Sequence, residues 1–580
     1  MAFGVSVRGL VYTALAVAAI TSVDAVEFSK EADASTAATV SAAGGSAAAD
    51  ATPATAASGA SAAADAAPAA AKSSAKSSTS SAAADDTASS AAATPIKAGE
   101  KLNKGWLNPI VVKGNKFFDS VTGLEFRMKG MAYYPRPNDG EFANVANYDW
   151  ASDDHENVWK ADLAVMQDLG VNTIRLYSVD PTRSHDKFMC ACAEAGIYVL
   201  IGMAAPCENC AIPDEKPPKC YPDELFSRMQ MVYNAFAVYD NTLGFSVGNE
   251  NNLLRKYVEG GTQTMPCVKA LLRDTRNYAA SCSGSVREVP IGLDLADILP
   301  REQWMEYFDC AADDNEFSRA EWIGFNPYVE CDPLKHTEYS QSTGLQTLMK
   351  AYEEVGFSRP LMFGEFGCNL GENTVDGYEN QRTFYDARWM NEEKEMTDQI
   401  VGGNVFEFVT EIPNTVAKKL TKEADEGRYG VGYYSPLTCD HDKVPCVFTP
   451  YPEYENLKKA YTTTKAATLK MDDYKITRTK IASCPSNITA DLQPMPKVET
   501  LKCTVAQPVC SGTKSNNFKK SAGGEVKLGE SKPASNEGVS LPGGGAGADG
   551  KTSAGGDDAA SIAVAASAVL LSAIATVMLA

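Results

Sequence analysis

Two short segments of the sequence each place a glutamate at the end of an apolar run. Glu250 follows Asn249 in Gly-Phe-Ser-Val-Gly-Asn-Glu, and Glu365 lies in Phe-Gly-Glu-Phe-Gly-Cys-Asn. An apolar strand that closes on a carboxylate is unfavourable unless that group is solvated, paired or used in chemistry. Glycoside hydrolysis needs two carboxyl groups, one to protonate the leaving oxygen and one to attack the anomeric carbon or activate water. For each glutamate alone, an ion pair at a strand end is the alternative interpretation.

Rigid elements must hold both groups, because a misplacement of about 1 Å can slow a reaction on the order of a hundredfold. Residues 99–465 carry nearly all the aromatic residues and apolar runs, and β-rich runs alternate there with segments of helical periodicity. This alternation predicts an α/β fold, a (β/α)8 TIM barrel. The expected strands are Phe126–Tyr133, Val171–Val179, Gly196–Ala204, Thr242–Glu250, Val289–Leu295, Trp322–Tyr328, Pro360–Gly367 and Asn404–Val409, and the expected helices include Val158–Leu169, His185–Ala195 and Leu225–Tyr239.

A barrel of this kind carries its catalytic groups at the carboxyl ends of its strands. Glu250 ends the fourth expected strand and Glu365 lies near the end of the seventh, so both would face the same side. A doubly wound open sheet is the alternative architecture. The sequence has no G-x-G-x-x-G after its first strand, which the dinucleotide-binding form of that architecture would require.

The amino-terminal segments predict secretion. Residues 1–25 resemble a signal peptide, with Arg8 before a short apolar core and a small-x-small cleavage pattern at Val23-Asp-Ala25. An uncleaved membrane anchor is the alternative. Residues 26–98 are mostly Ala, Ser, Thr, Asp and Lys and lack an apolar period. Such a segment cannot bury enough surface to offset its chain entropy, so we expect a disordered stalk rather than an alanine-rich helix.

The carboxyl-terminal segments predict a lipid anchor. Residues 466–510 form an expected small Cys-containing appendage with the sequon at Asn487, and residues 511–561 a low-complexity Gly/Ser-rich linker. Residues 562–580 are apolar and uncharged. Small residues, a polar spacer and such a tail match a glycosylphosphatidylinositol (GPI) signal. A tail-anchor helix is the alternative interpretation. The prediction is a monomer at the cell surface, held on the outer leaflet of the plasma membrane or in the cell wall.

Composition excludes several partners. The formal net charge of −21 argues against nucleic acid, whose phosphates require a basic surface. Four histidines, none at a ligand-like spacing, argue against a metal centre, and no cofactor is expected. The 15 cysteines indicate an oxidising compartment, and their odd number leaves at least one thiol unpaired within the chain.

Several motifs together resemble one enzyme family. They are Lys129-Gly-Met-Ala-Tyr133, Asn172-Thr-Ile-Arg175-Leu-Tyr177-Ser-Val-Asp180-Pro-Thr, His185-Asp186, Ala195-Gly-Ile-Tyr198-Val-Leu, Asn249-Glu250 and Gly364-Glu365-Phe-Gly-Cys368-Asn369. In order and spacing, residues 100–440 resemble glycoside hydrolase family 72, the GPI-anchored β-1,3-glucanosyltransferases of fungal-type cell walls. The resemblance implies a β-1,3-glucan substrate. The alternatives are an endo-β-1,3-glucanase on the same scaffold and a non-catalytic wall-binding or adhesive protein.

The resemblance also implies residue roles. Glu250 would be the general acid/base, Glu365 the nucleophile, and Asn249 a ligand of the sugar 2-hydroxyl. Arg175, Tyr177 and Tyr328 would line the catalytic subsite, with Tyr328 donating a hydrogen bond to Glu365. Tyr133 is expected to be an aromatic platform for a sugar ring. For the three tyrosines, a packing function is the alternative.

Three positions depart from the family pattern. Tyr134 stands where the family has Gln, Gly202 where it has Asp, and the strand-eight region reads Val405-Phe-Glu-Phe-Val-Thr-Glu411, with a matching Tyr-Gly only at Tyr429. These positions help to hold donor and acceptor sugars in the family. The departures therefore leave the balance between transfer and hydrolysis open.

The resemblance suggests two disulfides. Cys331 and Cys368 follow the sixth and seventh strands on the same face, and the family pattern supports their pairing. The family also suggests a bond between Cys310 and Cys439. Cys207, Cys210 and Cys220 lie in a Pro-rich insertion, where C-x-x-C suits zinc or redox chemistry but a disulfide-stapled loop is favoured in a His-poor, oxidising setting.

Overall fold

The structure, a computed structural model, describes residues 107–145, 148–205, 207–213, 219–253, 260–330, 336–368, 382–413, 429–504, 507–509 and 525–527. The predicted signal peptide, stalk and apolar tail lie outside these ranges, as does the linker except for one short strand. Within the described ranges, no helix is long and apolar enough to span a bilayer.

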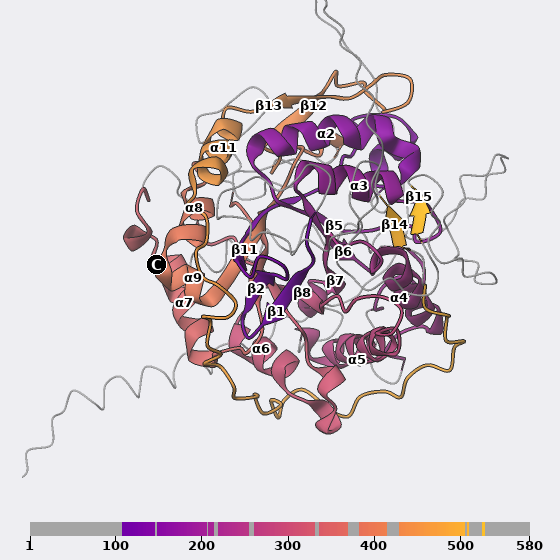
Figure 1. The fold of residues 1–580 in the computed structure, drawn as a ribbon, viewed down its shortest axis with the longest axis vertical. Coiled ribbons are helices and arrows are strands. Elements are labelled where there is room, and N and C mark those ends of the chain that lie inside the picture. Colours follow the sequence, from indigo (N-terminus) through magenta and orange to yellow (C-terminus); the bar gives the residue numbers. More distant parts are fainter. Residues whose placement is uncertain are drawn as a thin grey trace, which may run out of the picture. The chain divides into compact units, whose positions relative to one another are not determined.

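Eight parallel strands close into a barrel, which confirms the predicted fold and rules out an open sheet (Figure 1). The order around the barrel is β10-β11-β4-β5-β6-β7-β8-β9. The strands are β4 (Met128–Ala132), β5 (Thr173–Leu176), β6 (Tyr198–Gly202), β7 (Thr242–Asn249), β8 (Ile291–Ala296), β9 (Ile323–Asn326), β10 (Leu361–Phe366) and β11 (Ile400–Val405).

Six of these strands lie within their predicted ranges and β8 ends one residue beyond its range, whereas β11 agrees less well. β11 begins four residues before the expected Asn404–Val409. The prediction missed its first residues because Gly402 and Gly403 interrupt the β-rich sequence pattern. A Cβ at Gly402 would lie 2.2 Å from the backbone oxygen of Met128 in β4. Glycine is therefore required for close strand approach, a reason that only the closed barrel reveals.

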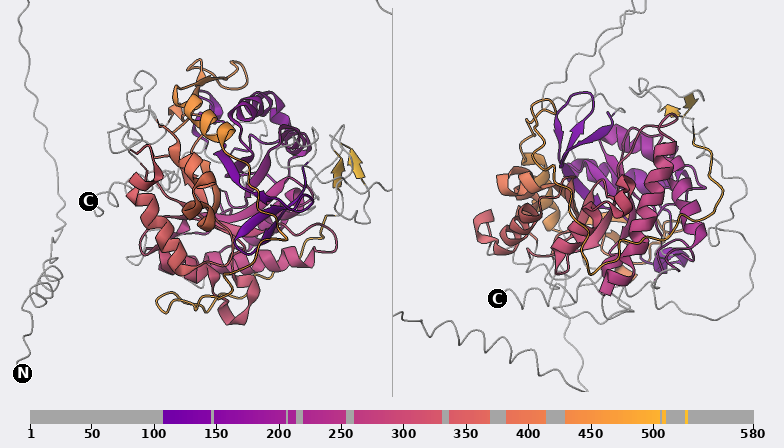
Figure 2. Two further views of the ribbon diagram at one scale, coloured as in Figure 1. Left: turned by 60° about the vertical axis from the view of Figure 1, so that its left-hand side comes forward. Right: turned by 90° about the horizontal axis from the view of Figure 1, so that it is seen from below.

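Helices surround the strands (Figures 1 and 2). The predicted helices appear as α2 (Glu156–Leu169), α3 (Asp186–Ala195) and α4 (Asp223–Phe236), and their apolar faces pack on the barrel. The described helices after these are α5 (Met265–Ser281), α6 (Arg301–Asp309), α7 (Thr343–Val355), α8 (Tyr385–Glu392), α9 (Lys394–Gln399) and α11 (Glu453–Thr463). Two strand pairs, β12 (Gly432–Ser435) with β13 (Val447–Pro450) and β14 (Gln507–Val509) with β15 (Glu525–Lys527), lie outside the barrel sheet.

A small antiparallel sheet packs at the amino end of the barrel. It consists of β1 (Ile110–Lys113), β2 (Lys116–Asp119) and β3 (Glu125–Phe126). Ile110 and Phe117 pack against the first residues of the barrel strands, among them Met128 and Tyr198. The two glutamates singled out in the sequence lie at the opposite, carboxyl end of the strands.

Residues 464–504, called the strap below, follow α11 without forming a helix or a named strand. The strap first contacts the amino end of the barrel, where the Glu125 N–H donates to the Leu469 oxygen and Arg478 donates to Gln399. It then runs along α6, α5 and α4, below α6 and α5 in the view of Figure 1. The segment predicted to be an appendage is therefore bonded along the barrel over much of its length.

Side chains of the barrel satisfy the strap's backbone. Tyr307 donates to the Thr489 oxygen at 2.8 Å, and the Leu501 N–H donates to Gln230 at 2.8 Å. Asn234 bonds twice, donating to the Lys502 oxygen and accepting from the Thr504 N–H. These bonds replace the ladder that a segment without regular structure lacks.

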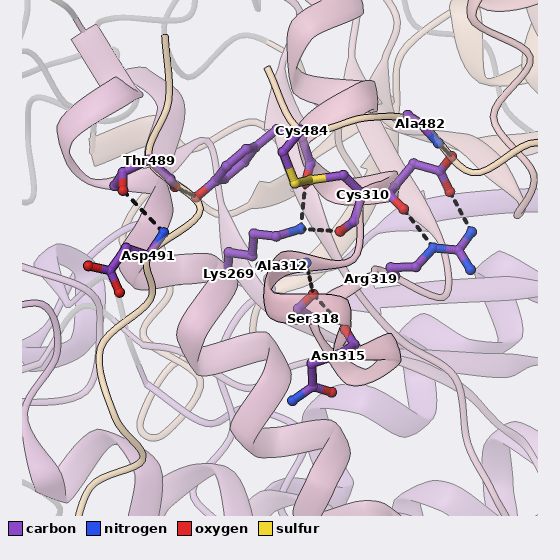
Figure 3. Close-up of a disulfide and its surroundings, with 12 residues drawn as sticks. Lys269, Cys310, Ala312, Asn315, Ser318, Arg319, Ala482, Cys484, Thr489 and Asp491 are labelled. Atoms are coloured by element: carbon purple, nitrogen blue, oxygen red, sulfur yellow. Dashed lines mark hydrogen bonds and ion pairs between the residues drawn. A yellow bond between two sulfur atoms is a disulfide. The ribbon is translucent and has the colours of Figure 1, made fainter. Parts of the chain in front are cut away.

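Two disulfides fasten the strap, Cys282–Cys503 and Cys310–Cys484. The predicted Cys310–Cys439 bond is therefore wrong, since Cys439 pairs with Cys446 across a short loop. The reason is that the strap brings Cys484 to the end of α6, a contact that the barrel alone does not specify. Figure 3 shows the buried Lys269 below this bond, donating to the oxygens of Tyr307 and Cys310.

The remaining cysteines follow the predictions in part. Cys207 and Cys210 form a disulfide, as expected for a stapled loop, and Cys220 bonds Cys267. Cys368 is disulfide-bonded, but Cys331 lies outside the described residues and that pairing stays a prediction. Cys192 is free and buried, consistent with the odd number of cysteines.

Candidate active site

Glu250 lies directly after β7, with its carboxyl group buried among polar side chains. Its φ of 53° lies in the left-handed region, which is unfavourable for a residue with a Cβ. Such strained backbone conformations occur preferentially at functional sites. Its N–H donates to the Asp294 oxygen at 3.0 Å, and Asn326 donates to its Oε1 at 2.8 Å. Burial, and next the charge of Glu365, raise the pKa of Glu250 to about 8. The group is therefore protonated near neutral pH, as a general acid must be.

Glu365 lies in β10 and accepts hydrogen bonds on both carboxylate oxygens. Arg175 and Tyr177 donate to Oε1 at 3.0 and 2.8 Å, and Tyr328 donates to Oε2 at 2.9 Å. Burial, and next the charge of Glu365, raise the pKa of Tyr328 well above its ordinary value, so its hydroxyl remains a donor. These bonds, one of them from a guanidinium, favour the ionised carboxylate that nucleophilic attack requires.

Arg175 in β5 joins the two halves of the site. Its Nη2 donates to Asn249 Oδ1 at 2.8 Å and lies 3.2 Å from Asp294 Oδ2, while its Nη1 contacts Glu365. Asn326 also donates to Asn249 Oδ1, at 3.2 Å. Because both bonds use the oxygen, the NH2 group of Asn249 is the part that can donate to a substrate hydroxyl.

Asp294 and Asn326 are site residues that the sequence-based prediction missed. Asp294 is buried in β8 and accepts from Ser246 Oγ at 2.7 Å besides its ion pair with Arg175. Glycines 324 and 364 leave room for its second oxygen, since a Cβ at either would lie within 2.3 Å of Asp294 Oδ1. The sequence signal that could have identified Asp294 is an aspartate inside an otherwise apolar strand.

Aromatic rings surround the Glu365 side of the site. Tyr177 contacts Phe406 edge to face, with ring centroids 6.4 Å apart, and Phe406 contacts Tyr429 at 5.5 Å. Tyr429 in turn contacts Tyr328 at 5.6 Å. The Tyr-Gly at 429–430 is thus brought back beside the strand-eight segment, although residues 414–428 separate them in the sequence.

Glu407, next to Phe406, is a further carboxyl group near the site. Its side chain is buried, and its Oε1 has no hydrogen-bond partner among the described residues. Burial, and next the charges of Glu411 and Glu365, raise the pKa of Glu407 well above its ordinary value. Protonation of Glu407 is therefore favoured over that of an ordinary glutamate.

Tyr133 does not lie where a sugar platform would. It is 2% exposed, and its hydroxyl donates to the buried Asp162 at 2.8 Å. The prediction of an aromatic platform at this position is therefore wrong, because the side chain packs between β4 and α2. The other predicted ligands, Arg175, Tyr177, Asn249 and Tyr328, contact one another or one of the two glutamates.

Gly202 has a structural reason to lack a side chain. A Cβ at this position would lie 2.4 Å from the backbone oxygen of Tyr177 and 2.8 Å from that of Leu176. The end of β6 therefore approaches β5 too closely for an aspartate in this backbone conformation. This position offers no acidic group to bind a sugar hydroxyl.

The arrangement places two carboxyl groups in one buried site, Glu250 with a raised pKa and Glu365 held by three donors, and retaining glycosidases use such a pair of carboxyl groups. Arg175, Tyr177, Tyr328 and Asn326 supply the hydrogen-bond donors that hold these two groups. Among the described residues, no group of three or more His, Cys, Asp or Glu side chains is placed to hold a metal ion.

Comparisons with known proteins agree with this geometry. The model of glycoside hydrolase family 72, described as glucanosyltransferase, matches residues 100–427. The 1,3-beta-glucanosyltransferase gel1 of Aspergillus fumigatus is 33% identical over 326 residues, which cover 56% of this chain and 62% of that protein. The 1,3-beta-glucanosyltransferase GAS4 of Saccharomyces cerevisiae is 31% identical over 310 residues, covering 53% and 60%. The chain thus spans about three fifths of the length of these curated relatives.

Solved structures show the same fold. Saccharomyces cerevisiae Gas2p in complex with laminaripentaose matches with a TM-score of 0.53 and 27% identity, covering 67% of this chain and 78% of that one. A mutant of Gas2p in complex with laminaritetraose and laminaripentaose matches with a TM-score of 0.52 and 26% identity, covering 67% and 75%. The ligands in both structures are laminari-oligosaccharides.

Proposed function

Because this chain belongs to the glucanosyltransferases of glycoside hydrolase family 72, we propose that it is a β-1,3-glucan transglycosylase acting by retaining double displacement. The observation that carries the proposal is the pair formed by Glu250 and Glu365, one protonated and the other held by three donors. The relatives named as 1,3-beta-glucanosyltransferases and the laminari-oligosaccharides bound to Gas2p support the choice of substrate.

In the first step, a Glu365 oxygen attacks the anomeric carbon while Glu250 gives its proton to the leaving glucan oxygen. The bond to the leaving chain breaks as the glucosyl ester of Glu365 forms. Loss of the negative charge on Glu365 removes a cause of the raised pKa of Glu250. The carboxylate of Glu250 is then more stable than before, and it is free to act as a base.

In the second step, Glu250 takes a proton from the acceptor, whose oxygen attacks the anomeric carbon and releases Glu365. A sugar hydroxyl as acceptor gives transfer, and water gives hydrolysis. The NH2 group of Asn249, oriented by Arg175 and Asn326, is placed to donate to the 2-hydroxyl, a contact that strengthens in the transition state.

Transfer requires the acceptor to compete with water, which is possible because alignment raises the effective molarity of a bound hydroxyl far above that of water. The absence of an acidic side chain at Gly202 removes one contact that the family pattern would provide. We therefore expect transfer together with more hydrolysis than in a relative that retains that contact.

The test is to incubate the protein with a reduced laminari-oligosaccharide at millimolar concentration and to size the products. Products longer than the substrate support the proposal. Shorter products alone, at every substrate concentration, indicate an endo-β-1,3-glucanase. An unchanged substrate indicates a wall-binding or adhesive protein and contradicts an enzymatic function.

We also propose that the mature protein is a GPI-anchored monomer at the cell surface or in the cell wall, glycosylated at Asn487. The sequences of residues 1–25 and 562–580 support this cellular location, and Asn487 is exposed in the strap. Phospholipase C should release the protein from intact cells. Detection of residues 562–580 in the mature chain by mass spectrometry would contradict the anchor.

A further inference from the structure

Four aromatic rings cluster on the segment that follows β4, and His441, from the segment after β12, packs against them. Phe142 and Tyr148 have ring centroids 4.1 Å apart, and Tyr148 and Trp150 are 4.6 Å apart. His155 and His441 each lie 4.9 Å from Trp150. Trp150 is buried, whereas Phe142 and Tyr148 are half-buried. These five residues, called the aromatic patch below, have no part in the mechanism described above.

The patch presents uncharged rings within a charged rim. Burial lowers the pKa of His155, and it lowers that of His441 to about 4, so both rings are neutral near neutral pH. The exposed Glu141 and the Arg183–Asp154 ion pair border the patch with both signs of charge. Aromatic faces with mixed polar groups around them suit a neutral ligand with apolar C–H faces and many hydroxyls, which describes a sugar ring.

Hydrogen bonds link the loop that carries the patch to two segments that follow strands of the catalytic site. Asp149, beside Tyr148, accepts from the Asp180 N–H at 2.7 Å, and Asp180 lies three residues after the Glu365 ligand Tyr177. On the other side, Arg136 donates to the Ala143 oxygen and to Glu411 after strand β11. The segments after β4, β5 and β11 all leave the carboxyl ends of their strands, and this end of the barrel carries Glu250 and Glu365.

We propose that the aromatic patch binds a glucosyl unit of the β-1,3-glucan remote from the bond that is cleaved, by stacking on Phe142 and Tyr148. The inference rests on the proposed function and extends it to a further subsite. It assigns to these two residues the platform function that the sequence-based prediction gave to the buried Tyr133. The unit can belong to the donor chain or to the acceptor chain.

The test measures binding to the catalytically inactive Glu250→Gln protein with and without Phe142→Ala and Tyr148→Ala. Loss of the stacking contacts should weaken the affinity for a long β-1,3-gluco-oligosaccharide about three- to tenfold, with little effect on a trisaccharide too short to reach the patch. Tyr148→Phe keeps the ring and loses the 2.9 Å contact to His155, and should therefore retain the affinity for the long chain. Phe317→Ala is the matched control, because Phe317 packs on Arg276 before β9, at the amino end of the barrel.

Unchanged affinity for the long chain, or equal weakening for both ligands, would overturn the proposed subsite. Failure of the Glu250→Gln protein to bind any β-1,3-glucan would instead overturn the glucan assignment and this subsite with it. Product sizing with the active enzyme separates the two sources of the sugar unit. A loss of long products alone identifies the acceptor chain, and an equal loss of transfer and hydrolysis identifies the donor chain.

Discussion

At the carboxyl end of the barrel, buried charged side chains bond to one another, whereas the strap is held by disulfides and by barrel side chains that bond its backbone groups. Arg175 contacts Glu365 and Asp294 in a buried cluster, and Glu250 adopts a left-handed backbone conformation. In the strap, Gln230 and Asn234 bond backbone groups, and two disulfides join it to the barrel.

This difference indicates that catalysis and stability depend on different regions of the molecule. Buried carboxyl groups are unfavourable for folding, because desolvation can exceed the gain from pairing. The strap offsets this unfavourable contribution to the free energy of folding. Its disulfides join residues 221 and 174 positions apart in the sequence and so restrict the unfolded chain. We therefore expect substitutions at the two regions to have different consequences for activity and for unfolding.

The largest expected effect is on activity, from Glu250→Gln and Glu365→Gln. Each should reduce kcat by about a thousandfold or more, because the general acid or the nucleophile is lost while the side-chain shape is kept. Thermal unfolding should show both proteins folded. Glu353→Gln on the exposed face of α7 is the control and should leave kcat unchanged. Near-normal turnover by either site variant would contradict the mechanism.

The next effect is on stability, from the double variant Cys310→Ser/Cys484→Ser. Loss of this long-range disulfide should reduce the free energy of unfolding by about 2–5 kcal/mol, with little change in kcat/KM at a temperature where the protein stays folded. The matched control is Cys207→Ser/Cys210→Ser, which opens a loop of sequence separation 3 and should destabilise less. Denaturant unfolding of the two variants checks the comparison, and equal destabilisation would refute the restriction of the unfolded chain as its cause.

Tyr328→Phe tests one donor at the catalytic end. It removes a hydrogen bond to the Glu365 carboxylate, a contact worth about 1.5–3 kcal/mol, so kcat/KM should fall about 10- to 100-fold. Steady-state kinetics on a laminari-oligosaccharide measure this change. Tyr352→Phe, which removes a buried hydroxyl on α7 that has no partner among the described residues, should leave kcat/KM unaltered.

The pH dependence follows from Glu250. Its pKa of about 8 in the folded protein lies above the ordinary 4.5, so kcat/KM should fall above about pH 8, when the general acid loses its proton. The folded state binds this proton more tightly than the unfolded state. The stability that Glu250 contributes is therefore present at low pH and is lost as the pH rises toward 8.

The titration of Glu250 can also be measured through the stability of the protein, without an activity assay. Glu250→Gln should unfold at a higher temperature than the parent near pH 8 and show a smaller difference below pH 4.5. Calorimetry at both pH values measures the change. A constant difference between the two proteins would show that Glu250 is not protonated in the folded state at neutral pH.

The smallest effect is expected from Asn234→Ala in α4. This substitution removes two bonds to the strap and leaves the Lys502 oxygen and the Thr504 N–H without them, which should destabilise by about 1–3 kcal/mol. Catalysis should not change. Combining it with Cys282→Ser/Cys503→Ser tests coupling within the strap, because contacts that share one segment are rarely additive.

The sequence by itself determined the barrel, its strand order along the chain and the two glutamates. These features depend on local periodicity and on residues adjacent in sequence, such as Asn249 and Glu250. It also indicated Arg175, Tyr177 and Tyr328, through motifs in which each follows or ends an apolar run. All three then donate to Glu365 because the carboxyl ends of parallel strands meet at one face.

Only the tertiary structure decided the contacts between distant segments. The pairing of Cys310 with Cys484 rather than Cys439 depends on the path of the strap, which no local pattern specifies. The burial of Tyr133 against Asp162, and the approach of Gly202 to Tyr177, depend on how strands and helices pack. Periodicity reports which face of an element is buried, but which residues meet there is set by the closed barrel.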